Sequence, residues 1–356
     1  MKTHTYSLFA AIAATGMAFG AETAYTTPVG YMTIPLPGTG GSTPQKLQLA
    51  NQGLLPNGPA YAGGGTAAVT FSGNTLTDTT ATFGTYTNAG TNSHVLEITS
   101  AGSVQGALSW ITTNTATSIT TADNLSSAGT AATYRVWQAY TMSSLFGNPP
   151  AASVLGGGTD ASTADNVQIL DPTTNTYTSF FYQNAGKGGL GWKSSDSGIL
   201  TPATYAIHPN DGLVILRKQS LDGALVISGS VKAGATKAVV EGNGTSTVLN
   251  ILANQLPVDQ LTLGASGLYT GNVATGLKGG TDATTADNLL IFNATANSYT
   301  TFFYQDSGKG GLGWKSSDSG IVDPTNYKLP ATGALLIQRK AGSSFNWTIP
   351  SVTVAP

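Results

Sequence analysis

The chain contains one segment twice, and this internal duplication constrains the fold more than any other feature of the sequence. A shift of 122 positions aligns residues 157–218 with residues 279–340 without a gap, and 38 of the 62 positions are identical. The thirteen residues GKGGLGWKSSDSG recur unchanged at 186–198 and 308–320. Because a sequence repeat of this kind encodes a repeated structural unit, we expect two similar units in the fold.

A weaker similarity extends the repeat toward the N-terminus. LQLANQGLLP (47–56) resembles LNILANQLP (249–257). The sequence therefore predicts a first unit over residues 21–220 and a second over 221–356. The first unit contains an additional segment near 62–135, where short runs such as SHVLEITSAG alternate apolar and polar residues as β-strands do.

The repeated segment has the pattern of an all-β protein. Its predicted strands are NVQILD, TYTSFFYQ, TYAIHP and GLVILRKQ. In TYTSFFYQ, aromatic residues fall on both faces, which predicts a strand covered on both sides. The fold class is therefore all-β, with two duplicated β-sandwich or barrel-like units and an extra β-rich segment in the first. Short helices are expected only in TMSSLFG (141–147) and TSTVLNILANQ (245–255).

The N-terminus resembles a secretory signal peptide over residues 1–20. Lys2 and His4 precede an apolar run from Tyr6 to Phe19, and Ala18-Phe19-Gly20 fits the small-x-small cleavage rule. The apolar run is shorter than the roughly 20 residues that span a bilayer, and no later stretch is long enough either. These features predict an exported bacterial protein, located extracellularly, at the cell surface or in the periplasm, without a membrane span in the mature chain.

The composition argues against several functional classes. Charged residues form 9% of the chain and the net charge is −2, so a basic surface for nucleic acid is not expected. The chain has no cysteine. Only three glutamates occur, Glu22, Glu97 and Glu241, and beyond His4 only His94 and His208 could serve a catalytic site. The sequence therefore predicts a protein that is not an enzyme.

Two short motifs in the chain lack the context that their chemistry needs. GKGGLG matches G-x-G-x-x-G, but a dinucleotide site requires a helix after the glycines, and WKSSDSG begins no helix. Glycines that allow positive φ in a long hairpin explain the pattern better. No G-x-S-x-G nucleophile elbow is present.

Aspartates recur at equivalent positions of the two copies and suggest two interpretations. Loop carboxylates are oxygen ligands of the kind that calcium takes. Aspartates in glycine-rich turns also bond their own backbone, and this second interpretation is favoured because no known calcium-loop spacing is matched. The sequence predicts no cofactor, with calcium as the alternative at Asp160, Asp165, Asp282 and Asp287.

The repeated loops carry the residue types of a sugar-binding face. Flat aromatic rings would stack on a sugar, while lysine and aspartate would bond its hydroxyl groups. The alternative is that each tryptophan fills one end of its sandwich and bonds its indole N–H internally. The candidate ligand-binding residues are Tyr182, Lys187, Trp192, Lys193 and Asp196, with Tyr304, Lys309, Trp314, Lys315 and Asp318 in the second copy.

Several stretches together resemble a known group of proteins. They are TTPVGYMTIPL (26–36), NTLTDTTATFGTYTNAG leading into HVLEITS, YTMSSLFG, and the TADN…FFY…GWK…Y run. With these features the chain resembles an uncharacterised family of exported repeat proteins from the Planctomycetes–Verrucomicrobia group of bacteria. The resemblance spans most of the mature chain and implies export, but it implies no activity and no catalytic residue.

The sequence as a whole predicts a non-catalytic extracellular or cell-surface protein with a structural or adhesive role. Export, low charge, absent cysteine and duplicated β units support this prediction. The alternative is a carbohydrate-binding protein that uses the GKGGLGWKSSDSG loops. The expected partners are further copies of the chain or a surface polymer or glycan, without nucleic acid.

Overall fold

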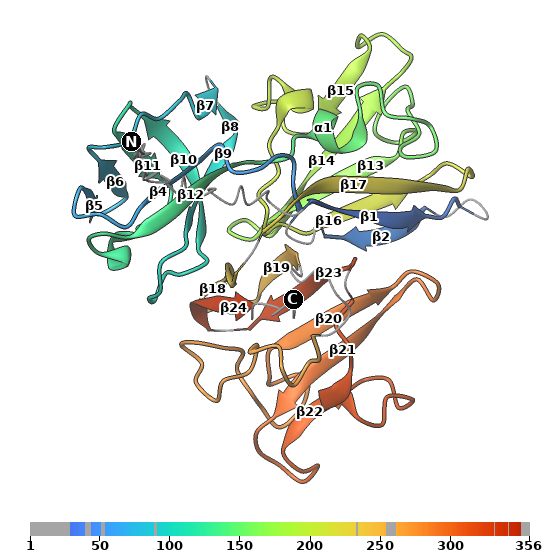
Figure 1. The fold of residues 1–356 in the computed structure, drawn as a ribbon. Coiled ribbons are helices and arrows are strands. Elements are labelled where there is room, and N and C mark those ends of the chain that lie inside the picture. Colours follow the sequence, from blue (N-terminus) through green and yellow to red (C-terminus); the bar gives the residue numbers. More distant parts are fainter. Residues whose placement is uncertain are drawn as a thin grey trace, which may run out of the picture.

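The fold is all-β, as the sequence predicts, and consists of two repeated units and an inserted seven-stranded sheet (Figure 1). The computed structural model describes the predicted mature chain in eight ranges. Within them, no helix is long and apolar enough to cross a membrane. The predicted signal peptide at 1–20 lies outside the described residues. The described ranges are 29–39, 44–50, 54–88, 91–232, 234–253, 261–330, 332–340 and 342–349.

The first unit is a sandwich of two antiparallel sheets. A five-stranded sheet in the order β15-β14-β13-β16-β2 packs against a three-stranded sheet, β1-β17-β3. Phe180, Ile215 and Leu36 are fully buried between the two sheets. The elements are β1 (Val29–Leu36), β2 (Gln45–Leu49), β3 (Leu54–Leu55), α1 (Met142–Phe146), β13 (Asn166–Asp171), β14 (Thr176–Gln183), β15 (Gly191–Ser194), β16 (Leu213–Arg217) and β17 (Gly223–Val231).

The second unit repeats this arrangement. Its five-stranded sheet has the order β19-β23-β20-β21-β22, which matches β2-β16-β13-β14-β15 strand for strand, and the ribbon β18-β24 covers it. Phe302 and Ile337 occupy the places of Phe180 and Ile215 in its core. The strands are β18 (Thr236–Asn243), β19 (Val248–Ala253), β20 (Asn288–Asn293), β21 (Ser298–Gln305), β22 (Gly313–Ser316), β23 (Ala334–Arg339) and β24 (Ser343–Ile349).

Strand pairing places the boundary between the units later than the sequence suggests. β17 pairs with β1 along its whole length, from Val29↔Ser230 to Leu36↔Gly223, so it completes the first sandwich. The predicted boundary at 220/221 separates β17 from that partner. The boundary that the pairing supports lies between Val231 and Thr236, because β18 pairs with β24 of the second unit.

Two local predictions outside the aligned strands are wrong. TSTVLNILANQ contains β19 instead of a helix, because Leu252 faces the core of the second unit while Ile251 faces the first unit. TYAIHP (204–209) begins within the 3-10 turn Pro202–Thr204 and forms no strand, only an isolated bridge between Ala206 and Thr141. The short helix predicted in TMSSLFG is confirmed as α1, whose capping box pairs Thr141 with Ser144.

The inserted segment forms a sheet in the order β4-β12-β9-β10-β11-β6-β5 that curls into a nearly closed barrel, called the barrel insert here (Figure 1). Leu96 and Val136 point into its core, while Val95 and Trp137 point outward and pack against Leu55 of β3. Side chains along a strand point alternately to its two faces, so the outward-pointing residues of the barrel strands attach the barrel to the first unit. Its strands are β4 (Tyr61–Gly64), β5 (Val69–Ser72), β6 (Thr75–Asp78), β9 (His94–Ile98), β10 (Leu108–Asn114), β11 (Ser118–Thr121) and β12 (Thr133–Gln138), beside the ribbon β7 (Thr87–Asn88) and β8 (Thr91–Asn92).

The two units pack through the second faces of their five-stranded sheets. Leu170 and Val214 of the first unit form one buried cluster with Ile251 and Leu336 of the second. Asn175, in the turn after β13, adds polar contacts: its Nδ2 donates to the carbonyl of Thr247 and its Oδ1 accepts the Leu249 N–H. The second face is covered over β13, β16, β19 and β23, where this cluster lies. The two-sided cover predicted for TYTSFFYQ is not found, because its second face lies beyond the cluster and Tyr177 on that face is 39% exposed.

One buried ion pair stabilises each unit. Asp287 contacts Arg339 at 2.6 Å and Asp165 contacts Arg217 at 3.5 Å, and all four side chains are fully buried. Each carboxylate also accepts backbone N–H groups from two different segments, for example Lys278 N at 2.8 Å and Lys340 N at 2.6 Å on Asp287. The pair thereby connects the start of one central strand to the end of its neighbour.

We expect Asp287→Asn to destabilise the protein by about 3–5 kcal/mol, because Arg339 would remain buried without its counter-charge. Asp318→Asn is the matched control, since Asp318 is exposed and the amide keeps an acceptor oxygen; its effect should stay within about 0.5 kcal/mol. Urea unfolding followed by tryptophan fluorescence measures both. Equal midpoints for the two variants would contradict a stabilising role of the pair.

Candidate functional site

The repeated GKGGLGWKSSDSG loops have the same backbone in both units. Gly189 and Gly191 have φ of 76° and 127°, and Gly311 and Gly313 have 75° and 128°. Residues with a Cβ rarely adopt these angles, so the glycines serve the hairpin that joins β14 to β15 and β21 to β22. No helix follows the glycines in either loop. This explains the G-x-G-x-x-G pattern without a nucleotide.

The tryptophans of the loops are core residues. Trp192 is 5% exposed and Trp314 is 6% exposed. The indole Nε1 of Trp192 donates to the carbonyl of Gly147 at 3.0 Å. Tyr182 and Tyr304 meet the two indoles edge-on, with ring centroids 6.0 and 5.6 Å apart. The two indoles are therefore not free to stack on a sugar, and the geometry favours the interpretation that each fills one end of its sandwich.

Most of the polar loop residues that the sequence predicts to bind a ligand form hydrogen bonds within their own loop instead. The Nζ of Lys193 donates to the carbonyl of Gly188 at 2.7 Å, and Lys315 repeats this contact with Gly310 at 2.7 Å. Asp196 and Asp318 each accept the backbone N–H two residues ahead, at 2.8 Å. Lys187 and Lys309 are exposed. The loops are thus rigid elements with few uncommitted polar groups.

The four aspartates considered as calcium ligands lie in two different environments, two in buried ion pairs and two in exposed turns. Asp165 and Asp287 belong to the buried ion pairs. Asp160 and Asp282 lie in exposed Asx-turns, where the hydroxyl of Thr284 bonds Asp282 and lowers its pKa to about 2. Within the described ranges, no three His, Asp or Glu side chains are grouped closely enough to hold a metal. The turn interpretation is favoured, and calcium at these residues stays a prediction.

Exposed aliphatic side chains around the loops were missed by the sequence reasoning. Leu190 and Leu312 are each 72% exposed at the loop tips, and Leu200 and Val322, shortly after β15 and β22, are 88% and 92% exposed. We call these four residues the apolar tips. A leucine between glycines in an otherwise polar loop, present in both copies, is the signal that could have revealed them.

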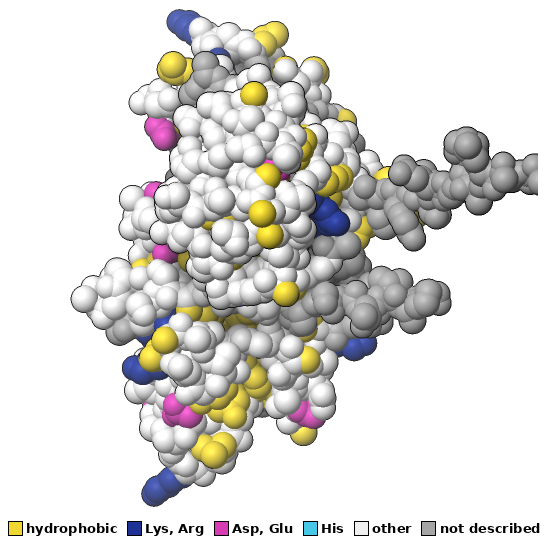
Figure 2. All heavy atoms as spheres, turned by 60° about the vertical axis from the view of Figure 1, so that its left-hand side comes forward, with side chains coloured by type: hydrophobic (Ala, Val, Ile, Leu, Met, Phe, Trp, Pro, Cys, Tyr) yellow, Lys and Arg dark blue, Asp and Glu magenta, His cyan; other side chains and the backbone are white. Residues whose placement is uncertain are grey.

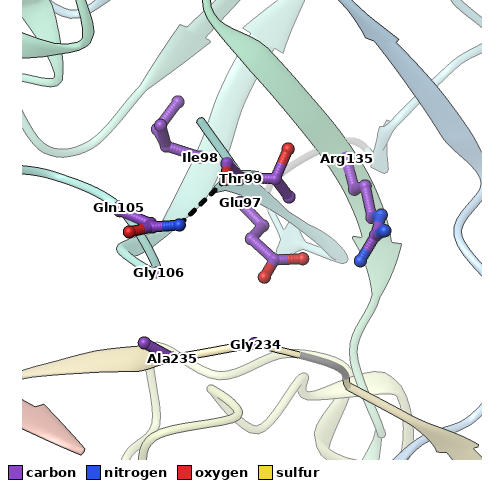
Figure 3. A pocket seen from close by; sticks show the side chains of 8 residues that line it. All are labelled: Glu97, Ile98, Thr99, Gln105, Gly106, Arg135, Gly234 and Ala235. Carbon is purple, nitrogen blue, oxygen red and sulfur yellow. Dashed lines mark hydrogen bonds between the residues drawn. The ribbon is translucent and has the colours of Figure 1, made fainter. Parts of the chain in front are cut away.

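A cavity of about 240 Å³ lies where the barrel insert meets the linker between the units (Figure 3). Glu97 and Arg135 both line it. The Glu97 carboxylate accepts the indole N–H of Trp137 at 2.6 Å and pairs with Lys232 of the linker at 2.9 Å, and Glu97 and Lys232 are almost completely buried. Glu97 therefore anchors the barrel to the linker.

A second cavity, of about 150 Å³, lies where the barrel and both units meet. Its lining includes His208, Asp211, Asp123 and Glu241. Burial raises the pKa of Asp211 to about 7 and lowers the pKa of His208 to about 4. The Nδ1 of His208 accepts the N–H of Asn210 at 3.2 Å, so the neutral ring is the form that this contact stabilises. The cavity holds both groups in their uncharged forms near pH 5.

Comparison with known proteins adds no assignment. No family model, no curated protein and no solved structure matches the chain. The resemblance to exported repeat proteins therefore stays a prediction.

We expect Trp314→Ala to cost about 3–5 kcal/mol of unfolding free energy, because it removes a buried ring from the second core. Leu312→Ser, two residues away at an apolar tip, should change the stability by less than about 0.5 kcal/mol. Urea unfolding with circular-dichroism detection compares them. A mild Trp314→Ala phenotype would show that this indole is not a core residue.

The two shifted pKa values predict opposite pH dependences for two variants. Because the folded pKa of Asp211 is raised, its contribution to stability is present below about pH 4 and is lost as the pH rises through about 7. The folded pKa of His208 is lowered, so its contribution is present above about pH 6.5 and is lost as the pH falls through about 4. In the native protein, the contribution of Asp211 makes the stability fall with rising pH, while the contribution of His208 makes it rise.

The melting temperature of Asp211→Asn should therefore rise between pH 4 and 6.5, where only His208 still acts. That of His208→Asn should fall between pH 4 and 7, where only Asp211 acts. Thermal unfolding from pH 4 to 7.5 tests this. If both variants keep the native profile, these groups do not titrate with shifted pKa values.

Proposed function

We propose that this protein is a non-catalytic structural or adhesive component of a bacterial cell surface, and that its two units bind neighbouring protein molecules through the apolar tips. The observation that supports this most is the matched exposure of Leu190 and Leu312, 72% in each case. Aliphatic side chains exposed at equivalent positions of the two units would offer a partner the same apolar contact twice.

The loops are suited to binding because they are already ordered. Lys193 and Lys315 hold the loop carbonyls, and Trp192 and Trp314 anchor the strands that follow. A rigid loop loses little conformational entropy on association, so more of the burial energy of its leucine contributes to affinity. β15 and β22 are also edge strands of their sheets, which brings each tip to the outer end of its unit.

Two copies of one contact surface make the chain bivalent. A heterologous contact repeated between bivalent subunits extends into a chain or lattice unless its rotation closes a ring. Low charge suits such packing: charged residues form 9% of the chain, and those visible on the face in Figure 2 are few. Export, predicted from residues 1–20, would place this assembly outside the cytoplasm.

The chemistry of the described residues supports a role without catalysis. Glu97 is committed to Lys232 and Trp137. His94 bonds Ser93 and the carbonyl of Tyr86, and no carboxylate contacts its ring within the described part of the chain. The alternative of sugar binding by the repeated loops has less support, because the indoles that would stack on the sugar are buried.

We expect the chain beginning at Ala21 to form oligomers or polymers whose mass rises with protein concentration, because apolar tips pair intermolecularly. The variant Leu190→Ser/Leu312→Ser should stay monomeric to at least tenfold higher concentration. Light scattering coupled to size exclusion, with and without calcium, and negative-stain microscopy measure this.

Leu221→Ser is the matched control, since Leu221 is 53% exposed but lies outside the repeated loops. It should assemble like the native chain. A native protein that stays monomeric at high concentration in both conditions would refute self-assembly. A calcium requirement would instead direct attention to Asp160 and Asp282.

A further inference from the structure

We infer that the second unit contains a binding site for a neutral saccharide in a surface cavity whose charged residues have no charged counterparts in the first unit. The cavity measures about 320 Å³. It is separate from the apolar tips, and the inference does not depend on the proposed function. The lining residues that carry the argument are Tyr269, Asn272, Lys278, Gly279 and Asp306.

The cavity has an aromatic wall that is held in place from behind. The ring of Tyr269 stacks on Tyr304 with a centroid distance of 3.5 Å and an interplanar angle of 10°. Tyr304 in turn meets the buried Trp314 edge-on. Tyr269 is partly exposed, so the stack connects the core of the unit to the cavity. A fixed flat ring of this kind packs against the C–H face of a sugar and needs no rearrangement.

A lysine and an aspartate lie at the rim of the cavity but do not form an ion pair with each other. Lys278 and Asp306 are both exposed, and they are not among the ion pairs of the described residues. The Nζ of Lys278 donates no hydrogen bond within the described ranges, whereas one oxygen of Asp306 accepts the Ser307 hydroxyl at 2.9 Å. A donor and an acceptor side by side suit neighbouring hydroxyl groups, since a hydroxyl both donates and accepts.

The loop that lines the cavity is anchored by the buried ion pair of the unit. The Nη2 of Arg339 donates to the carbonyl of Val273 at 2.6 Å and its Nη1 to that of Gly276 at 3.0 Å. The N–H of Leu277 closes the loop on the carbonyl of Leu268 at 2.7 Å. Gly279 leaves room for Asp306, because a Cβ there would lie 2.5 Å from the Asp306 carboxylate. The site is therefore preorganised.

Comparison of the two copies shows that the charged groups of the cavity are specific to the second unit. Gly156 and Asn184 occupy the positions of Lys278 and Asp306 in the first unit, with the same backbone hydrogen bonds: Gly156 and Lys278 donate to Asp165 and Asp287, both at 2.8 Å. The first unit has helix α1 where the second has the loop with Tyr269. The two units therefore differ here in charge and in the presence of an aromatic ring, although the hydrogen bonds of the backbone are the same.

The charge and size of the cavity select the class of ligand. One lysine and one aspartate make the rim neutral overall, which gives no net attraction for phosphate, sulfate or other anions. A volume of about 320 Å³ is at the lower end of the 300–1,000 Å³ typical of ligand pockets and accommodates one or two sugar rings. An uncharged hexose unit of a polysaccharide fits both properties.

The test is calorimetric titration of the mature chain with cellotetraose, maltotetraose and mannotetraose, and with tetragalacturonate as an acidic comparison. We expect at least one neutral tetrasaccharide to bind, with no binding of tetragalacturonate. Lys278→Gly/Asp306→Asn should weaken binding at least tenfold. This variant introduces the residues that the first unit has at these positions, Gly156 and Asn184. Because the same backbone accommodates them there, we expect the variant to fold. Tyr269→Ala should abolish binding.

Tyr31→Ala is the control, since Tyr31 is 80% exposed on β1, outside the cavity lining, and its loss should leave binding unchanged. Absence of binding by all three neutral sugars, binding that survives Lys278→Gly/Asp306→Asn, or preference for the acidic sugar would each overturn the inference. Assembly is measured independently with the Leu190→Ser/Leu312→Ser variant, so failure of one proposal leaves the other standing.

Discussion

The buried aspartate–arginine pair is the interaction on which the rest of each unit depends. Asp287 joins the loop before β20 to the end of β23, while Arg339 binds carbonyls of the surface loop that precedes β20. Asp165 and Arg217 do the same in the first unit, with Arg217 bonding Val154 and Leu221. Because the backbone groups of these long loops cannot all pair in a sheet, a buried guanidinium and carboxylate satisfy them and give the loops a defined shape.

This shared frame leaves the surface loops free to differ. Arg217 holds a loop next to helix α1 in the first unit, and the equivalent Arg339 holds the loop with Tyr269 in the second. The GKGGLGWKSSDSG loops, in contrast, are equal in sequence and in backbone angles. One duplicated scaffold therefore presents the apolar tips at equivalent positions of both units, and a cavity with charged residues that only the second unit has.

The barrel insert depends on a different kind of contact. Its strands bury alternate residues inside the barrel and direct the remaining ones, Val95, Glu97 and Trp137, toward the first unit and the linker. The Glu97–Lys232 pair is buried and also bonds the Trp137 indole, so the linker between the units is attached to the insert as well. The three parts are connected by buried contacts at their common junction, where His208 and Asp211 also lie.

The sequence alone was sufficient to predict the all-β class, the duplication, the insert and helix α1, because strand alternation, repeats and capping residues are local patterns. It did not show that β17 belongs to the first sandwich or that β19 is a strand, since pairing partners lie up to two hundred residues away. The burial of Trp192 and Trp314 and the exposure of Leu190 and Leu312 were likewise decided by the tertiary structure. Both residue types are apolar, and only the direction in which the hairpin turns determines which of them meets the core.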